Sequence, residues 1–123
     1  MRETGRTVLS VVDDIFFAAK LQAVAEAAGI RLIEARTFEE FRTQASSSIP
    51  DLVVVDLNSV ACRPLEVIGF LKSDRRLGAV PIVGFLSHVQ VDLEKAAKAA
   101  GCDRVIPRSR FASQLAGLLA GAV

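Results

Sequence analysis

The chain alternates short apolar runs with longer stretches in which apolar residues recur every three or four positions. The apolar runs predict strands at residues 8–12, 31–35, 52–55, 81–86 and 105–106, and the helical spacing predicts helices at 16–28, from 38, from 64, at 93–100, and at a last segment marked by Phe111, Leu115 and Leu118. Five strands alternating with five helices indicate an α/β fold. We expect a doubly wound (βα)5 parallel sheet covered by helices on both faces, in three layers.

Local sequence signals support several of these boundaries. Thr37 and Glu40 form a capping-box pattern for the second helix, and Pro64 suits the first position of the third. Gly101 ends the Ala-rich fourth helix. The 52–55 run is wholly apolar, as expected for a strand buried on both faces.

Three carboxylates follow two of the predicted strands. Asp13 and Asp14 end the first strand and Asp56 ends the third. In a flavodoxin-like strand order 2-1-3-4-5 these strands are neighbours, so the three side chains converge at one crevice. Close carboxylates repel one another, and Mg²⁺ prefers such oxygen ligands. A carboxylate beside such a cation can act as a nucleophile toward a phosphoryl group. A plainer interpretation of Asp14 is that it caps the first helix.

Composition narrows the function classes. The 123 residues carry fifteen basic and fourteen acidic side chains, a net charge of +1 that argues neither for nucleic acid nor for an anionic membrane surface. No apolar run approaches the roughly 20 residues of a membrane helix, and the N-terminus lacks a signal-peptide pattern. Cys62 and Cys102 have no metal-ligand spacing with His88. We therefore expect a cytoplasmic chain with reduced thiols and one domain over residues 1–123, with its core at about 7–120.

The acidic motifs carry a family resemblance. The runs Val-Val-Asp13-Asp14 and Asp-Leu-Val-Val-Val-Asp56-Leu-Asn58 resemble the CheY-like receiver domains of bacterial response regulators, from Thr7 to about Leu119. The resemblance implies that Asp13 and Asp14 hold Mg²⁺ together with Asp56 and the backbone carbonyl of Asn58. It also implies that Asp56 accepts phosphate from the phosphohistidine of a histidine kinase or histidine phosphotransfer protein.

Other positions depart from the family pattern. Leu86 stands where the family has a Thr or Ser that follows the phosphoryl group, and we expect it to pack in the core. The next residue, Ser87, faces away from the site unless the strand has already ended. Val105 replaces the family's aromatic reporter. Arg108 replaces a Lys; it either contacts the phosphoryl group or lies on the surface. Ser109 replaces a Pro, so we predict a trans Arg108–Ser109 bond.

Two further features are left open by the sequence. His88 lies where the family places residues that tune dephosphorylation, and it either approaches the phosphoryl group or is an exposed loop histidine. Of Phe16 and Phe17, one should be core and the other should cover the site or a partner surface. A homodimer through the last helix is also left open, on a face lined by Phe111, Leu115 and neighbouring alanines, some of which must pack on the sheet as core.

The sequence favours a phosphoryl-accepting module of a two-component system that signals through an unknown downstream protein. The alternative is a degenerate receiver that serves as a phosphorylation-independent scaffold, which the missing hydroxyl, Lys and aromatic residue would suit. An enzyme on the same sheet is disfavoured. A flavin-phosphate site would be repelled by Asp13 and Asp14, and related acylphosphate phosphatases carry an Asp where this chain has Asn58.

Overall fold

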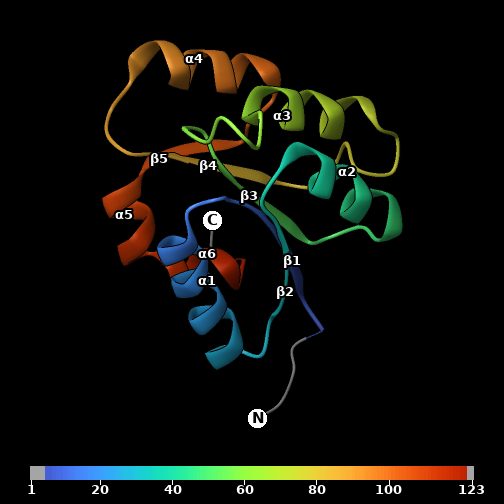
Figure 1. Cartoon of the computed structure of the whole chain (residues 1–123), viewed down its shortest axis with the longest axis vertical. Coiled ribbons are helices and arrows are strands. Elements are labelled where there is room, and N and C mark those ends of the chain that lie inside the picture. Colours follow the sequence, from blue (N-terminus) through green and yellow to red (C-terminus); the bar gives the residue numbers. More distant parts are fainter. Residues whose placement is uncertain (1–4, 122–123) are drawn as a thin grey trace.

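The computed structural model describes residues 5–121 and contains one parallel sheet. Its strands run in the order β2-β1-β3-β4-β5 (Figure 1). They are β1 (Thr7–Val11), β2 (Arg31–Ala35), β3 (Leu52–Asp56), β4 (Ile82–Leu86) and β5 (Arg104–Pro107). The predicted flavodoxin-like order is confirmed, and the strand boundaries agree to within one or two residues.

The helices form two layers around the sheet. They are α1 (Ile15–Ala27), α2 (Phe38–Ser47), α3 (Pro64–Ser73), α4 (Val91–Ala100), α5 (Arg108–Ser113) and α6 (Leu115–Leu119). Helices α2, α3 and α4 cover one face, and α1, α5 and α6 cover the other (Figure 1). Within the described residues, no helix is both long enough and apolar enough to cross a bilayer.

The predicted capping signals act as the sequence suggests. The Thr37 hydroxyl accepts the Glu40 N–H at 3.1 Å, and the Glu40 carboxylate reaches back to the Arg36 N–H at 2.7 Å. Gly101 ends α4 with φ of 117°, a left-handed conformation that favours glycine. These local contacts fix where the helices begin and end, and therefore where the loops after each strand lie.

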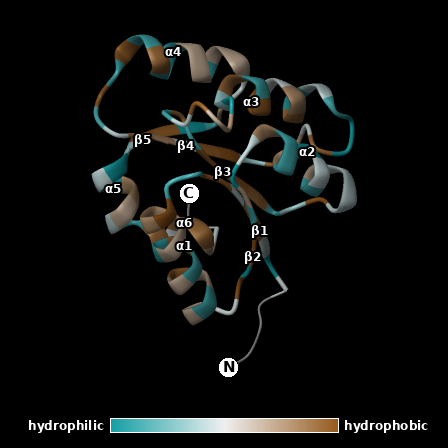
Figure 2. Ribbon diagram, viewed as in Figure 1, coloured by the Kyte–Doolittle hydropathy of each residue, from teal (hydrophilic) through white to brown (hydrophobic). Residues whose placement is uncertain are grey.

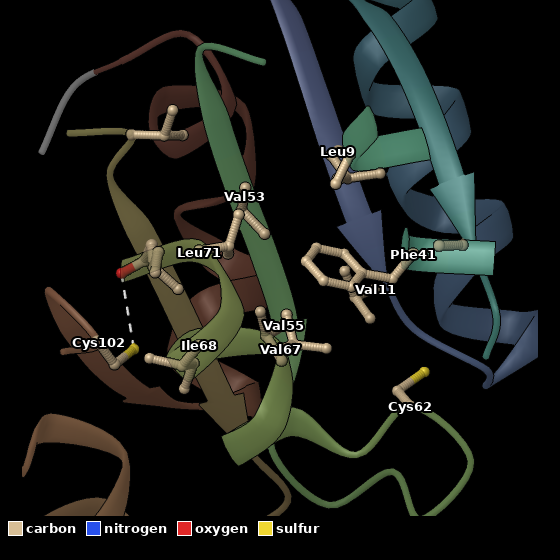
Figure 3. Packing of buried hydrophobic residues seen from close by; sticks show 14 of the residues in the cluster. Leu9, Val11, Phe41, Val53, Val55, Cys62, Val67, Ile68, Leu71 and Cys102 are labelled. Atoms are coloured by element: carbon tan, nitrogen blue, oxygen red, sulfur yellow. Dashed lines mark hydrogen bonds between the residues drawn. The ribbon is translucent and has the colours of Figure 1, made fainter. Parts of the chain in front are cut away.

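A separate hydrophobic core lies on each face of the sheet. On the α2–α4 side, side chains from β1 and β3 pack against α2 and α3 (Figure 3); they include Leu9, Val11, Phe41, Val53, Val55, Ile68 and Leu71. On the α1 side the core includes Phe17, Leu21, Val54, Phe85, Phe111 and Leu115. The central strands are strongly hydrophobic (Figure 2) because residues of both faces alternate along them.

The last helical segment differs from the prediction. A single final helix was expected, but it divides at Gln114, whose φ of −108° and ψ of 8° lie outside helical geometry. The Arg110 carbonyl accepts both the Gln114 N–H at 3.1 Å and the Ser113 hydroxyl at 2.9 Å. The break lets α5 and α6 each turn an apolar side toward the sheet.

The expected dimer face is also wrong in its key residues. Phe111 is 0% exposed and Leu115 2% exposed, so both belong to the core. Residues that pack against the sheet cannot line a docking surface. A homodimer would therefore have to use other side chains of α5 and α6.

Candidate functional site

The fold brings the three predicted carboxylates to one end of the sheet. Strands β1 and β3 are paired in parallel, with Val11 opposite Val55, so the residues that follow them meet at the same edge. Asp13 is exposed and Asp14 is half-buried, whereas Asp56 is only 8% exposed. Asp56 is thus the most buried of the three carboxylates, and the two others are more accessible to solvent.

Asp56 is held by its own loop. Its Oδ1 accepts the Asn58 N–H at 2.9 Å, and no other described residue donates a hydrogen bond to this carboxylate. Burial raises the pKa of Asp56, and the charges of Asp13 and Asp14 raise it further, against the opposing Asn58 N–H and the Arg108 charge. The second carboxylate oxygen of Asp56 therefore accepts no hydrogen bond from any described residue.

Asp14 accepts hydrogen bonds with both of its carboxylate oxygens. Its Oδ1 caps α1 by accepting the N–H groups of Phe16 at 2.9 Å and Phe17 at 3.1 Å. Its Oδ2 accepts a hydrogen bond from Arg108 Nη2 at 2.5 Å. The Phe17 N–H, followed by the Arg108 guanidinium, lowers the pKa of Asp14. The capping interpretation is thus correct for one oxygen, while the other faces the site.

Arg108 lies at the site rather than on the open surface. The guanidinium carbon is 4.7 Å from the centroid of the Phe17 ring and 5.7 Å from that of Phe85. The Phe85 ring stacks in turn on Phe111, at 4.9 Å and 7°. Phe85 was not singled out from the sequence, and its position one residue before the end of β4 is the signal that could have found it.

The residues that depart from the family pattern have clear positions. Leu86 is 1% exposed and packs in the core, as expected. Val105 is half-buried against the same core and pairs with Gly84. The Arg108–Ser109 bond is trans, as predicted, since no peptide bond within residues 5–121 is cis.

Asn58 links the loop after β3 to the loop after β4. Its Oδ1 accepts the Ser87 N–H at 2.7 Å, and its Nδ2 donates to Oε1 of Gln90 at 2.8 Å. We call this pair of bonds the Asn58 clasp. Gln90 immediately precedes α4, so the clasp joins the Asp56 segment to the start of that helix.

Ser87 and His88 lie beyond the end of β4, and both are exposed. The Ser87 hydroxyl contacts Nδ1 of His88 at 3.2 Å. Within residues 5–121, this is the one side-chain hydrogen bond of the imidazole. The exposed-loop interpretation of His88 therefore describes this structure.

Gly84 in β4 lies very close to the side chain of Leu57, the residue after Asp56. A Cβ on Gly84 would lie 2.9 Å from Cδ1 and 3.0 Å from Cγ of Leu57, which is itself buried. The Leu57 side chain fills the space that a side chain at position 84 would need. The position of the Asp56–Asn58 segment therefore depends on a glycine in β4.

The carboxylates suit a hard cation in their chemistry but are not arranged as a ready site. Among residues 5–121, no three Asp, Glu, His or Cys side chains are grouped closely enough to hold a metal ion. Asp13 is exposed and one oxygen of Asp56 accepts no hydrogen bond, but both oxygens of Asp14 are engaged. The donor set therefore suits Mg²⁺ in its chemistry, while Arg108 occupies Asp14 in this geometry.

An apolar rim surrounds these loops. Phe16 is 84% exposed and Val60 91% exposed. Phe17 is buried, which confirms that one of the two phenylalanines is core. The rim consists of the exposed residues at the starts of α1, α3 and α4 and in the adjoining loops: Ile15, Phe16, Val60, Leu65, Val89 and Val91.

No family model matches the chain. The polar-differentiation response regulator DivK of Brucella ovis is 25% identical over 103 residues, which cover 84% of each chain. The chemotaxis response regulator CheY4 of Vibrio cholerae has the same fold, with a TM-score of 0.85 over 98% of this chain and 100% of that one, at 18% identity. This chain has the fold of CheY-like receiver domains and resembles a response regulator in sequence.

The receiver fold also occurs in a structure that contains a metal. The receiver domain of a sensor histidine kinase from Pseudomonas aeruginosa has a TM-score of 0.82 over 94% of this chain and 95% of that one, at 15% identity, with a magnesium ion coordinated in its active site cleft. Receivers of this type are signalling modules of two-component systems rather than conventional enzymes. The unusual features of the present receiver are Leu86, Val105 and Arg108.

Proposed function

We propose that this receiver accepts a phosphoryl group on Asp56 from the phosphohistidine of a histidine kinase or histidine phosphotransfer protein, with Mg²⁺ as cofactor. The observation that carries the proposal is the placement of Asp56. Its carboxylate is buried at the end of β3, fixed through one oxygen by Asn58, and overlooked by Asp13 and Asp14. A fixed carboxylate with one unbonded oxygen is prepared for in-line attack.

In the proposed reaction the unbonded Asp56 oxygen attacks phosphorus, and the phosphorus–nitrogen bond to the donor imidazole breaks. The imidazole leaves with the bonding electron pair and takes up a proton, and Asp56 becomes an acyl phosphate. Asp13, Asp14, Asp56 and the Asn58 carbonyl would hold Mg²⁺, which would neutralise charge on the transferred phosphoryl oxygens. Arg108 would supply a second positive charge from the opposite side of the crevice.

The apolar rim suits the donor protein. Phosphoryl transfer requires the donor histidine to enter the crevice, so the donor must contact the loops that surround it. The exposed side chains of Phe16, Val60 and Val89 lie on those loops and offer apolar area to bury. Their exposure is better explained by a transient partner than by the fold, which has a separate core.

We further propose that residues 1–123 form a single cytoplasmic receiver domain that signals by protein–protein contact with a downstream partner. The phosphorylation-independent scaffold is less favoured because the acceptor, both neighbouring carboxylates and a basic residue meet at one place. What the scaffold alternative explains well is the loss of the hydroxyl and aromatic residues at Leu86 and Val105.

Intact-mass spectrometry tests the proposal. Incubation with acetyl phosphate and Mg²⁺ should add one phosphoryl group to the wild-type receiver and none to the Asp56→Asn variant. Asp51→Asn is a matched control, since Asp51 is an exposed carboxylate at the opposite end of β3, and it should leave the uptake unchanged. No uptake by the wild type, under conditions that load an ordinary receiver, would favour the scaffold.

A further inference from the structure

Arg108 occupies the one carboxylate oxygen of Asp14 that does not cap α1. One Asp14 oxygen caps α1 through two backbone N–H groups, and the other accepts the Arg108 guanidinium at 2.5 Å. The cap cannot be given up without exposing the first N–H groups of α1. Any cation that binds Asp14 must therefore take the oxygen that Arg108 holds.

The guanidinium is held by more than Asp14. It lies against the Phe17 and Phe85 rings, at 4.7 and 5.7 Å from their centroids, and Phe111 supports Phe85 from behind. Both rings belong to the core, so this aromatic surface is fixed. Arg108 can leave Asp14 and still remain beside the crevice.

We propose that Arg108 is a built-in competitor of the divalent cation for Asp14, and that cation binding releases its guanidinium toward the phosphoryl group on Asp56. The inference rests on the proposed function and adds an order of events to it. The cation displaces Arg108 from Asp14, and the displaced guanidinium then turns toward the phosphoryl group. By linkage, whatever holds Arg108 on Asp14 weakens metal binding by the same factor that the metal weakens the Arg108–Asp14 pair.

Replacement of Arg108 should therefore tighten metal binding. A hydrogen bond to a charged group contributes enough that its loss changes an equilibrium by about tenfold or more. We expect Arg108→Met, which keeps an apolar stem for the aromatic surface, to bind the cation about tenfold more tightly. Arg108→Lys keeps the charge but loses the planar stacking on the phenylalanine rings. Its affinity for the cation should lie between those of the wild type and Arg108→Met.

Mn²⁺ titration followed by electron paramagnetic resonance measures this directly. The chain has neither Trp nor Tyr, so a bound-metal signal is preferable to fluorescence quenching. Arg110→Met is the matched control: Arg110 is exposed two residues away in the same helix, and its loss should change the Mn²⁺ affinity less than twofold. Far-UV circular dichroism establishes that each variant is folded.

A second measurement needs no variant. The Nε–Hε resonance of Arg108 in the wild-type receiver should shift as Mg²⁺ is added, with the same midpoint as metal binding. Tighter Mn²⁺ binding by Arg108→Met together with this shift would support the competition. If wild type and Arg108→Met bind Mn²⁺ equally, or if the resonance does not move while metal binds, the competition is refuted and the proposed function stands. If neither protein binds Mn²⁺ at millimolar concentration, the metal-dependent function fails and the competition fails with it.

Discussion

Truncation of the Asn58 side chain tests whether the clasp couples the Asp56 segment to the start of α4. Asn58→Ala removes both bonds of the clasp, to the Ser87 N–H at 2.7 Å and to the Gln90 amide at 2.8 Å. It leaves the Asn58 backbone N–H that binds Asp56. The variant therefore separates the link between the two loops from the support of the acceptor itself.

The size of the effect follows from the number and exposure of the bonds. A net contribution of about 0.5–1.5 kcal/mol per hydrogen bond applies, and the exposure of Asn58 places both bonds in the lower half of that range. We expect Asn58→Ala to lower the free energy of unfolding by about 1–2 kcal/mol. Gln90→Ala removes one of the two bonds and no cap, because the Gln90 side chain does not cap α4, so it should cost about half as much.

Urea unfolding followed by circular dichroism gives these differences, and amide hydrogen exchange at Ser87 reports the local bond. Exchange at Ser87 should accelerate in Asn58→Ala and remain slow in Gln90→Ala. With beryllofluoride bound, the chemical shift changes in α4 should also be smaller in Asn58→Ala than in the wild type. If the free energy of unfolding of Asn58→Ala lies within about 0.3 kcal/mol of the wild-type value and Ser87 exchange is unchanged, the clasp does not stabilise the contact between the two loops, and this reasoning is refuted.

Four other outcomes are expected. Gly84→Ala should lower stability by about 1–3 kcal/mol in urea unfolding, because its methyl group overlaps Leu57, and a double-mutant cycle with Leu57→Ala should show positive coupling; additive effects would contradict the overlap. Burial raises the pKa of Asp56, so its favourable contribution is present below the ordinary Asp pKa of about 3.9 and is lost as pH rises through the folded value. Asp56→Asn should therefore be more stable than the wild type at neutral pH but not at acid pH, and a constant difference across a pH series would refute this. Phe17→Ala should cost about 3–5 kcal/mol and Phe16→Ala less than about 0.5, and equal costs in urea would be inconsistent with their exposures. Because the hydroxyl and aromatic switch residues are missing, beryllofluoride should change partner or dimer affinity by less than about tenfold; a larger change in a titration would reveal an intact switch.

The fold could be predicted because the local spacing of apolar residues and the order of the elements along the chain indicate the same architecture. Apolar runs of strand length alternate with helical spacing, and parallel topology then places Asp13, Asp14 and Asp56 together without any knowledge of their side-chain contacts. The division at Gln114 could not be predicted, because the spacing of apolar residues on either side of it continues a regular helix. The break is a change of backbone angles at one residue, which leaves no periodic signal.

The details of the site depend on tertiary contacts. Whether Arg108 reaches Asp14 depends on two phenylalanine rings from α1 and β4, neither of which lies near it in sequence. The resemblance to receivers implied a role for the Asn58 backbone carbonyl, whereas in the structure the Asn58 side chain links two loops through the clasp. Sequence position identified the residues of the site, and three-dimensional packing determines which atoms of each residue are used.

The contact between Arg6 and Leu119 has a practical consequence for reporter design. Arg6 Nε donates to the Leu119 carbonyl at 2.6 Å, although the two residues are 113 positions apart. Both therefore lie at the edge of the sheet where β1 begins, and the five residues of β1, at about 3.3 Å each, separate that edge from the acidic crevice by roughly 16 Å. A fusion joined next to Arg6 or Leu119 would therefore start at the end of the sheet away from Asp56. A pair of such fusions would report assembly of the receiver with its partners while leaving the crevice open to them.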